Sequence, residues 1–460
     1  INIYDLWNRQ EKVNVSVRRS EPEFYFKKAL NWSATTMGGS SFRITNNKTS
    51  STAAPSLYFK NDDDLYVSLA LLNSCISQVY MDLLNPTVGL KLANVEAVPA
   101  INFEKMAVFL RSSCENNIAL SKEDWDSYEI SWDFEQHPLV KRKELHSLEK
   151  CYLTWKTECE NRFLKMKDNE EHINVVILKE YGLENEVSCE VPEKSISVHR
   201  IFDTKEDIPV SMDGSYYVRT KRDEIVSLIS YSVGCMFGRY SLDKKGIVNA
   251  GAPLNVNEYV SFSVDKDNII PICDDEYFKD DIVGRFVEFI KIVYGADSLD
   301  DNLTFIAKAL GGKGSPREII RNYFVNDFYK EHCATYSGTV GKRPIYWLFD
   351  AGKNNSFKAL IYMHRYQPDT IARIRTDYVH EQQARYRTAI ADLEQRIANT
   401  STGERVKLKK KLATLQAQDT EIRTYEEKIH HLADQMISIN LDDGVKKNYA
   451  IFQDVLAKIK

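Results

Sequence analysis

Alternating apolar side chains mark the strands that this sequence predicts most clearly. In residues 345–350, one face would carry Ile345, Trp347 and Phe349 and the other Tyr346, Leu348 and Asp350, which is the period of a strand seen from both faces. A second apolar run, residues 357–362, follows a turn-forming Gly-Lys-Asn-Asn segment. The two runs therefore predict a β-hairpin with a long loop.

Apolar residues at helical spacing predict helices along much of the chain. Asp63 or Asp64 is the expected N-cap of one helix, whose apolar positions are Leu65, Leu69, Leu72, Ile76, Val79 and Leu83. Further helices are expected within residues 103–180 and over residues 223–236, 283–294 and 317–329, the last entered through Pro316. Residues 246–272 alternate like short strands.

The polar residues 377–440 predict two antiparallel helices with a break at residues 399–403. Their apolar stripes are Tyr386, Ile390, Leu393 and Ile397 on the first arm, and Leu408, Leu412, Leu415, Ile422, Ile429 and Leu432 on the second. A basic cluster lies near the tip, formed by Arg405, Lys407, Lys409, Lys410 and Lys411. It is either a solvated helix face or a contact for DNA phosphates.

Composition limits the classes of function. The chain has 460 residues and a formal net charge of -5, so any nucleic-acid contact has to be local and about three domains are expected. We expect a soluble, cytoplasmic protein without a membrane segment or signal peptide. The eight cysteines lack zinc-ligand spacing and predict reduced thiols and no metal site. Because the chain begins at Ile1, we expect a fragment or a processed product.

Residues 33–56 are too polar for a core and predict exposed loops and short strands. Within and just before this segment, Lys and Arg side chains are suited to phosphates, and small hydroxyl and amide groups are suited to base edges. The candidate DNA-binding residues here are Lys27, Lys28, Ser33, Thr35, Thr36, Ser40, Ser41, Arg43, Asn46 and Lys48; Arg405, Lys407 and Lys410 are added from the basic cluster. Arg43 is the choice for guanine or phosphate, and Asn46 for adenine. The alternative for each is an ordinary polar loop position.

Several segments together resemble a known family. They are residues 24–33, 57–87, 94–99, 121–139, 221–243, 341–366 and 441–460. In this order they resemble the C-terminal region of the BREX phage-defence adenine methyltransferases (PglX), which are similar in design to single-chain type IIG restriction-modification enzymes. Residues 24–99 look like the target-recognition domains of these methyltransferases.

The resemblance implies an α+β fold. A mixed target-recognition-like domain (1–105) would be followed by a helical spacer (106–190), a mixed α/β domain (191–340), and a hairpin with C-terminal coiled-coil helices (341–460). The implied function is recognition of double-stranded DNA within an adenine-N6 methyltransferase that uses S-adenosylmethionine. That cofactor would bind a catalytic domain missing from this chain. The alternative is a module that docks other BREX proteins and makes little contact with DNA.

The motifs for catalysis are incomplete in this chain. Residues 84–87 (Leu-Asn-Pro-Thr) lack the second proline and the aromatic residue of the methyltransferase motif that holds a flipped adenine, and they predict a helix-stop turn. Residues 234–238 and 338–343 have the wrong context or spacing for a cofactor loop or a phosphate loop. No catalytic residue is predicted.

Overall fold

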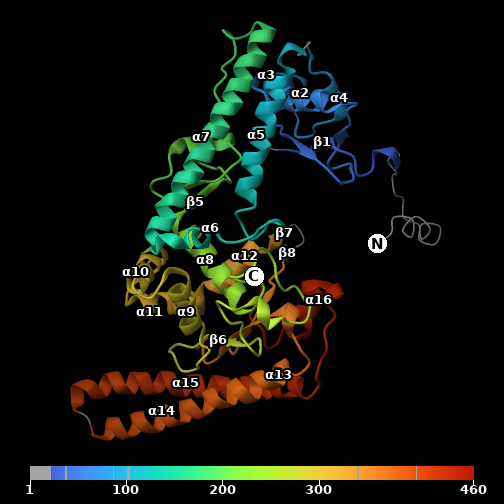
Figure 1. Cartoon of the computed structure of the whole chain (residues 1–460). Coiled ribbons are helices and arrows are strands. Elements are labelled where there is room, and N and C mark those ends of the chain that lie inside the picture. The colour runs from blue at the N-terminus through green and yellow to red at the C-terminus, as the bar shows by residue number, and fades with distance from the viewer. Residues whose placement is uncertain are drawn as a thin grey trace, which may run out of the picture. The chain divides into compact units, whose positions relative to one another are not determined.

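The computed structural model describes residues 22–36, 39–85, 87–100, 104–338, 341–399 and 401–459. These residues form mainly helices, together with a few small sheets (Figure 1), so the expected α+β class is confirmed. The chain forms two compact units, one of Ile1–Glu123, Glu160–Val198 and Pro209–Tyr217, the other of Asp124–Cys159, His199–Ile208 and Val218–Lys460. Whether the four sequence segments fold as separate domains stays a prediction.

The first unit contains a three-stranded antiparallel sheet in the order β2-β1-β3. Its strands are β1 (Ala29–Trp32), β2 (Phe42–Thr45) and β3 (Ser56–Leu57). Its α-helices are α2 (Asp62–Asn73), α3 (Cys75–Leu84), α4 (Leu92–Glu96), nearly all of α5 (Ala107–Trp125) and the later part of α7 (Leu148–Tyr181). Leu30 and Trp32 of the sheet share one buried cluster with Leu65 of α2, Leu110 of α5 and Ile177 of α7.

The single helix predicted from Asp63 or Asp64 is two helices, because Ser74 breaks it. Ser74 is extended (φ -73°, ψ 161°) and its hydroxyl accepts a hydrogen bond from the backbone N–H of Ser77, which caps α3. The predicted N-cap is also wrong: Asn61 caps α2, and its Oδ1 accepts from the N–H of Asp64 at 2.8 Å. The side chain of Asn61, just before the helix, accepts a hydrogen bond from one of the first-turn N–H groups, which have no partner within the helix.

The second unit is mainly helical. Its α-helices are α6 (Pro138–Lys141), the first part of α7, α8 (Lys221–Met236), α9 (Ile282–Tyr294), α10 (Leu299–Leu310), α11 (Pro316–Asn326), α12 (Phe328–Thr335), α13 (Thr370–Arg373), α14 (His380–Asn399), α15 (Thr402–Ala433) and α16 (Gly444–Ile451). A π-helix, η8 (Ile374–Val379), continues α13 into α14. Strands β4 (Arg200–Phe202) and β5 (Val218–Thr220) pair in parallel, and β7 (Ser337–Gly338) pairs antiparallel with β8 (Gly341–Lys342).

Short 3-10 helices connect these elements in both units. They are η1 (Pro22–Phe24), η2 (Glu104–Met106), η3 (Lys143–Leu145), η4 (Glu193–Ser195), η5 (Val210–Met212), η6 (Val256–Glu258), η7 (Met363–Arg365) and η9 (Leu441–Asp443).

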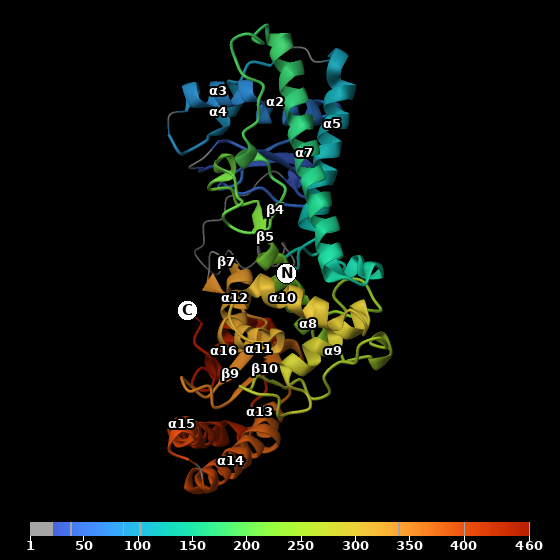
Figure 2. The same ribbon diagram turned by 90° about the vertical axis from the view of Figure 1, so that its left-hand side faces the viewer.

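A central three-stranded sheet organises the second unit. The predicted hairpin is confirmed: β9 (Tyr346–Asp350) pairs antiparallel with β10 (Lys358–Tyr362), and β6 (Ile270–Pro271) adds to the other edge of β10. One face of the hairpin joins a buried cluster with residues of α8 to α12, and the other face joins a cluster with residues of α13 to α16. Figure 2 shows β9 and β10 between helices α8 to α12 and helices α13 to α15.

The other sequence predictions for this unit have mixed outcomes. Helices α8 and α9 match the predicted residues 223–236 and 283–294. Ser315 caps α11 with Pro316 in the first turn as expected, but the predicted helix 317–329 is broken at Asp327 into α11 and α12. Within residues 246–272 only β6 is a strand.

In the rest of residues 246–272, hydrogen bonds from side chains take the role that strand pairing would have in a sheet. The Tyr259 hydroxyl donates to the carbonyl of Gly238 at 2.6 Å, and Asn249 Nδ2 donates to the carbonyl of Ala252 at 2.7 Å. These bonds satisfy the backbone without strand pairing. The alternating side chains of this segment predicted strands, but apart from β6 the segment forms no backbone pairing with a strand.

The predicted C-terminal helical hairpin is confirmed. Helices α14 and α15 lie side by side in Figures 1 and 2 and run in opposite directions around the break, in which residue 400 lies outside the described residues. Tyr386, Leu393, Ile422 and Ile429 of the predicted stripes are buried, whereas Leu408 and Leu412 are only half-buried. The hairpin is therefore anchored at the end that meets the sheet.

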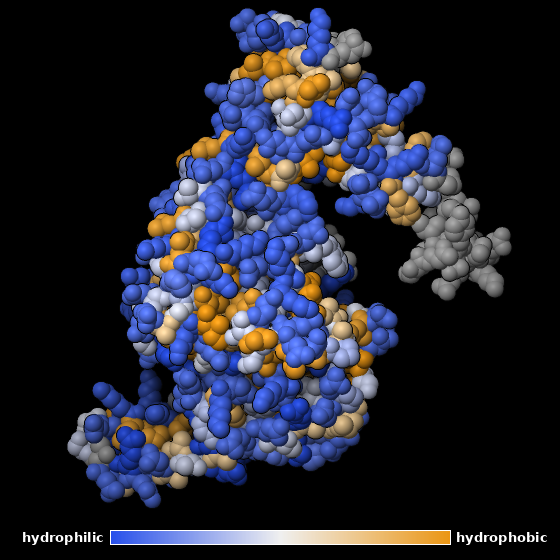
Figure 3. Space-filling view, in the orientation of Figure 1, coloured by the Kyte–Doolittle hydropathy of each residue, from blue (hydrophilic) through white to orange (hydrophobic). Residues whose placement is uncertain are grey.

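Cysteines and surface hydropathy agree with the sequence analysis. All eight cysteines are free thiols, and six of them are buried. The face shown in Figure 3 is largely hydrophilic, with apolar residues in small groups. No described helix by itself is long and apolar enough to cross a membrane; α2 and α3 taken together meet that criterion, with a bend of 68° between them.

A matched pair of glycines tests the packing around the central sheet. A Cβ on Gly234 in α8 would lie 2.5 Å from Cδ2 of the buried Tyr240, whereas a Cβ on Gly403 in α15 would meet nothing within 4 Å. We expect Gly234→Ala to lower the free energy of unfolding by about 1–3 kcal/mol, and Gly403→Ala to leave it unchanged or raise it by up to about 1 kcal/mol. Urea denaturation followed by tryptophan fluorescence measures both. Equal effects of the two substitutions would contradict this packing.

Candidate nucleic-acid interface

The sheet of the first unit has an apolar face and a polar face. Antiparallel pairing places Asn31 of β1 opposite Arg43 of β2 and Ser56 of β3, and directly paired residues share a face. Thr45 lies two residues beyond Arg43 on that same face. The Thr45 hydroxyl donates to Asn31 Oδ1, and Asn31 Nδ2 donates to Ser56 Oγ. We call these four residues the polar sheet face.

The candidate residues of the first unit do not form one loop. Lys27 and Lys28 precede β1, and Asn46 and Lys48 follow β2, so all four lie at one end of the strand pair. The remaining loop candidates lie at the other end, beyond strands of about 13 Å; they are Ser33, Thr35, Thr36, Ser40 and Ser41. Arg43 lies on β2 between the two groups. Residues 37 and 38 of the loop lie outside the described residues.

Three of the candidates are engaged in holding the unit together. Lys28 Nζ lies 2.8 Å from Asp62 Oδ2 and 4.7 Å from the centroid of the Tyr66 ring, which ties β1 to α2. The backbone N–H of Ser40 donates to Gln78 Oε1 of α3 at 3.2 Å, and that of Thr36 donates to the carbonyl of Val88 at 2.9 Å. The other candidates in this unit are exposed: Lys27, Ser33, Thr35, Ser41, Arg43, Asn46 and Lys48.

The polar sheet face contains residues that the sequence analysis missed. Asn31, Thr45 and Ser56 join Arg43 only through strand pairing. The period-2 alternation around Trp32 and Phe42 is the signal that could have found them, but choosing the register requires the pairing itself.

Arg43 is exposed and its charge acts on Glu170 of α7. Burial raises the pKa of Glu170 to about 7, and the positive charge of Arg43 opposes this rise. No ion pair with a described residue fixes the Arg43 guanidinium, which is thus available for a ligand. Its forked N–H groups match a phosphate or the major-groove edge of guanine.

The basic cluster of the second unit lies in the first turns of α15. Lys407 and Lys410 are exposed, three residues apart and on one face of the helix, and Arg405 is half-buried. This charge near the tip of a projecting helical hairpin is suited to a phosphate backbone or an acidic partner.

Arg365, just after the β9–β10 hairpin, forms hydrogen bonds within the chain. Arg365 is half-buried, and its guanidinium donates to the backbone carbonyls of Phe237 at 3.2 Å and Asp265 at 2.8 Å. Because these bonds link η7 to the end of α8 and the loop before β6, Arg365 is engaged inside the chain.

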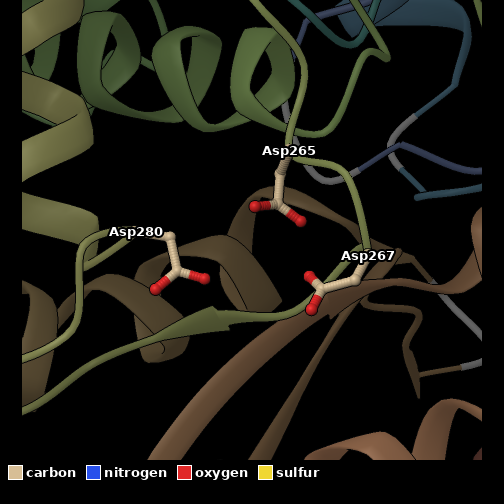
Figure 4. A group of neighbouring side chains, drawn as sticks. All are labelled: Asp265, Asp267 and Asp280. Atoms are coloured by element: carbon tan, nitrogen blue, oxygen red, sulfur yellow. The ribbon is translucent and has the colours of Figure 1, made fainter. Parts of the chain in front are cut away.

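Three carboxylates approach one another beside β6, and Figure 4 shows them facing a common space. The ligand atoms of Asp265, Asp267 and Asp280 all lie within 4.8 Å of one another. Donors of the same chain surround them: the Tyr378 hydroxyl lies 2.6 Å from Asp280 Oδ2 and 2.9 Å from Asp267 Oδ2, and the N–H of Ile269 donates to Asp265 Oδ1 at 3.1 Å. We assign no metal to this cluster, since these protein donors account for its geometry.

The Asn-Pro turn at residues 84–87 follows α3, but Pro86 lies outside the described residues. The N–H of Asn85 donates to the carbonyl of Met81 at 2.9 Å, and the helix ends at Asn85 because its backbone is not helical (φ -136°, ψ 79°). Residues 338–343 contain part of β7 and all of β8, and residues 339 and 340 are likewise outside the described residues.

Two curated proteins match nearly the whole chain. It is 37% identical over 438 residues to the adenine-specific methyltransferase PglX of Lacticaseibacillus casei (strain Zhang), with 93% of the chain and 34% of that protein covered. It is 33% identical over 469 residues to the adenine-specific methyltransferase BrxX of Escherichia coli O9:H4 (strain HS), with 98% of the chain and 38% of that protein covered. The chain is homologous to part of these methyltransferases. It spans about a third of their length.

No family model matches the chain. The homology confirms the relation to adenine-specific methyltransferases that the sequence segments indicated. The roles of individual candidate residues in this chain stay predictions.

The carboxylate cluster makes a pH-dependent stability prediction. Burial, followed by the neighbouring Asp267 carboxylate, raises the pKa of Asp265 from 3.8 to about 7. Between these values the folded chain keeps a proton that the unfolded chain has lost, so this group makes stability fall as pH rises from about 4 to 7. Asp265→Asn cannot ionise and keeps the acceptor for the N–H of Ile269. We expect it to stabilise the chain by up to about 4 kcal/mol at pH 8 and by about 1 kcal/mol at pH 4.5.

Thermal unfolding at the two pH values measures this difference. The exposed Asp297 provides the control, because Asp297→Asn also removes one carboxylate from the same unit. A pH-independent effect of Asp265→Asn, or an equal effect of both substitutions, would show that Asp265 is ionised at little cost in the folded chain.

Proposed function

We propose that this chain provides sequence-specific recognition of double-stranded DNA to an adenine-N6 methyltransferase of the BREX phage-defence type. Its homology to part of two adenine-specific methyltransferases supports this proposal. Catalysis and the binding of S-adenosylmethionine would be supplied by the part of such a methyltransferase that has no counterpart in this chain. The protein would present one adenine of the selected site to that catalytic part.

The polar sheet face is the observation that carries the DNA proposal. A guanidinium, two hydroxyls and an amide lie on one side of a small sheet whose other side is core: Arg43, Thr45, Ser56 and Asn31. Exposed lysines at one end, Lys27 and Lys48, supply charge for phosphates. Hydrogen-bonding groups on a rigid element suit base readout better than the same groups on a mobile loop.

The lysines of α15 would add contacts that do not depend on sequence. They are far along the chain from the sheet and are offered by a helical hairpin, a geometry that suits the phosphate backbone. Docking of other BREX proteins is the alternative for this hairpin, and binding experiments with DNA distinguish the two.

Arg43 is the sharpest test of the recognition role. In a methyltransferase that contains this chain, Arg43→Ala should change the choice of methylated site or lower methylation about tenfold, because a bidentate arginine contributes about 1–3 kcal/mol of discrimination. Sequencing of methylated adenines measures both effects. Arg43→Lys keeps the charge and loses the fork, so it should retain DNA affinity while its site choice relaxes.

The matched control for Arg43→Ala removes an exposed positive charge from the other unit. Lys313, in the loop between α10 and α11, is exposed, and Lys313→Ala should leave site choice and rate unchanged. If methylation by the Arg43→Ala protein equals that by the Lys313→Ala protein in pattern and rate, Arg43 has no part in recognition.

The lysines of α15 are tested by the salt dependence of binding. The chain should bind duplex DNA with an affinity that falls steeply as salt rises, and Lys407→Ala with Lys410→Ala should weaken binding to all sequences alike. The slope of log affinity against log salt should decrease by about two. Fluorescence anisotropy with labelled duplexes measures this. An unchanged slope assigns these lysines to another partner, and no binding even at low salt would favour the docking alternative for the whole chain.

A further inference from the structure

Hydrogen bonds within the polar sheet face fix the direction in which its hydroxyl groups can bond to a ligand. Asn31, in the central strand β1, is bonded to Thr45 of β2 and to Ser56 of β3. Asn31 Nδ2 also donates to the backbone carbonyl of Pro55 at 3.2 Å. Because a carbonyl can only accept, this bond decides which end of the amide is the NH2 group, and Oδ1 is the atom that meets Thr45.

The Thr45 hydroxyl is left as an acceptor. Asn31 Oδ1 has no hydrogen, so the single hydrogen of the Thr45 hydroxyl is used in the bond between the two side chains. The lone pairs of Thr45 Oγ1 receive no hydrogen bond from a described residue. Thr45 is half-buried and lies on the face of the sheet away from the core. A ligand on this face therefore has to donate a hydrogen to Thr45.

The Ser56 hydroxyl has the opposite role. Its oxygen accepts from Asn31 Nδ2, and its hydrogen has no acceptor among the described residues, so this hydroxyl is left to donate. Both N–H groups of Asn31 are engaged, one by Pro55 and one by Ser56. An asparagine that reads adenine needs a free N–H group beside its oxygen. Asn31 therefore orients the two hydroxyls and does not itself read a base.

The four bases differ in the group that such hydroxyls would meet in the major groove. Adenine and cytosine present an amino group there, whereas guanine and thymine present a keto oxygen in its place. A hydroxyl oxygen that can only accept will bond to the amino group, but against a keto oxygen two acceptors would face each other. A hydroxyl that donates is less selective, because of the four bases only cytosine lacks an acceptor in the major groove.

We infer that Thr45 selects an amino base, adenine or cytosine, over a keto base, guanine or thymine, at one position of the recognised DNA site. Asn31 is the positioning residue, because it takes up the Thr45 hydrogen. The inference rests on the recognition function proposed above and names the group of the DNA that this part of the face contacts. Arg43 cannot supply the same preference, since a guanidinium only donates.

Selection of duplexes from a randomised pool by the 460-residue chain, followed by sequencing, measures base preference at each position. At one position, adenine and cytosine on one strand should be bound better than guanine and thymine on that strand. Thr45→Val keeps the shape but cannot accept, so it should lower this preference about fivefold or more. Thr45→Ser keeps the hydroxyl and should retain the preference. Thr52→Val is the matched control, since Thr52 is an exposed threonine between β2 and β3.

Base analogues test the amino group itself. Purine in place of the selected adenine, or pyrimidin-2-one in place of the selected cytosine, lacks only that group. Either should weaken binding by the unsubstituted chain about fivefold more than binding by the Thr45→Val protein. Asn31→Ala frees the Thr45 hydrogen, so it should reduce the discrimination between amino and keto bases and leave affinity for the unselected pool unchanged. A purely structural role of Asn31 would instead lower affinity for all duplexes alike.

Equal base preferences of the Thr45→Val and Thr52→Val proteins would overturn the role of Thr45 and leave DNA recognition standing. The same holds if the position sensitive to Thr45 does not separate adenine and cytosine from guanine and thymine, or if the analogues affect both proteins equally. If Thr45→Val does not fold, as judged by circular dichroism, Asn31→Ala takes its place in the selection. A chain that selects no sequence at all would overturn the proposed function, and this inference with it.

Discussion

Burial of the β9–β10 hairpin on both faces is the constraint on which the second unit depends. Tyr346, Leu348, Leu360 and Tyr362 belong to one hydrophobic cluster, whereas Trp347, Phe349, Ala359 and Ile361 belong to the other. A shift of one residue in strand register would exchange the two sets. The hairpin therefore fixes the helices α8 to α12 on one side and α13 to α16 on the other, and the base of the α14–α15 hairpin takes its position from it.

The sequence predicted those parts of the fold in which local pattern and tertiary role coincide. The hairpin alternates because it is buried on both faces, and α8, α9, α14 and α15 have continuous apolar stripes that pack on a neighbour. Prediction failed where a side chain replaced the regular hydrogen bonds. Ser74 divides a continuous apolar stripe by capping the next helix, and Tyr259 and Asn249 hold a loop that alternates like a strand. Such contacts depend on where distant backbone groups lie.

The candidate interface shows the same limit. Residue type singled out exposed groups such as Lys27, Arg43 and Lys48, but could not tell them from Lys28, which is paired with Asp62. Nor could it join Asn31 and Ser56 to Arg43, since strand register decides which residues share a face. The period of the strands was visible in the sequence; their pairing partners were not.

The two faces of the β2-β1-β3 sheet differ in what they contribute: one face forms the core, and the other presents the polar groups of the proposed recognition surface. Leu30, Trp32 and Phe42 bury one face against α2, α5 and α7, and the fold of this unit depends on them. The opposite face contributes hydrogen-bonding groups that lie on the side of the sheet away from that core. Surface substitutions away from buried networks usually change stability by less than about 0.5 kcal/mol. Under the proposed recognition role, substitutions at Arg43 and its neighbours would change the preferred DNA sequence while the scaffold that presents them stays the same.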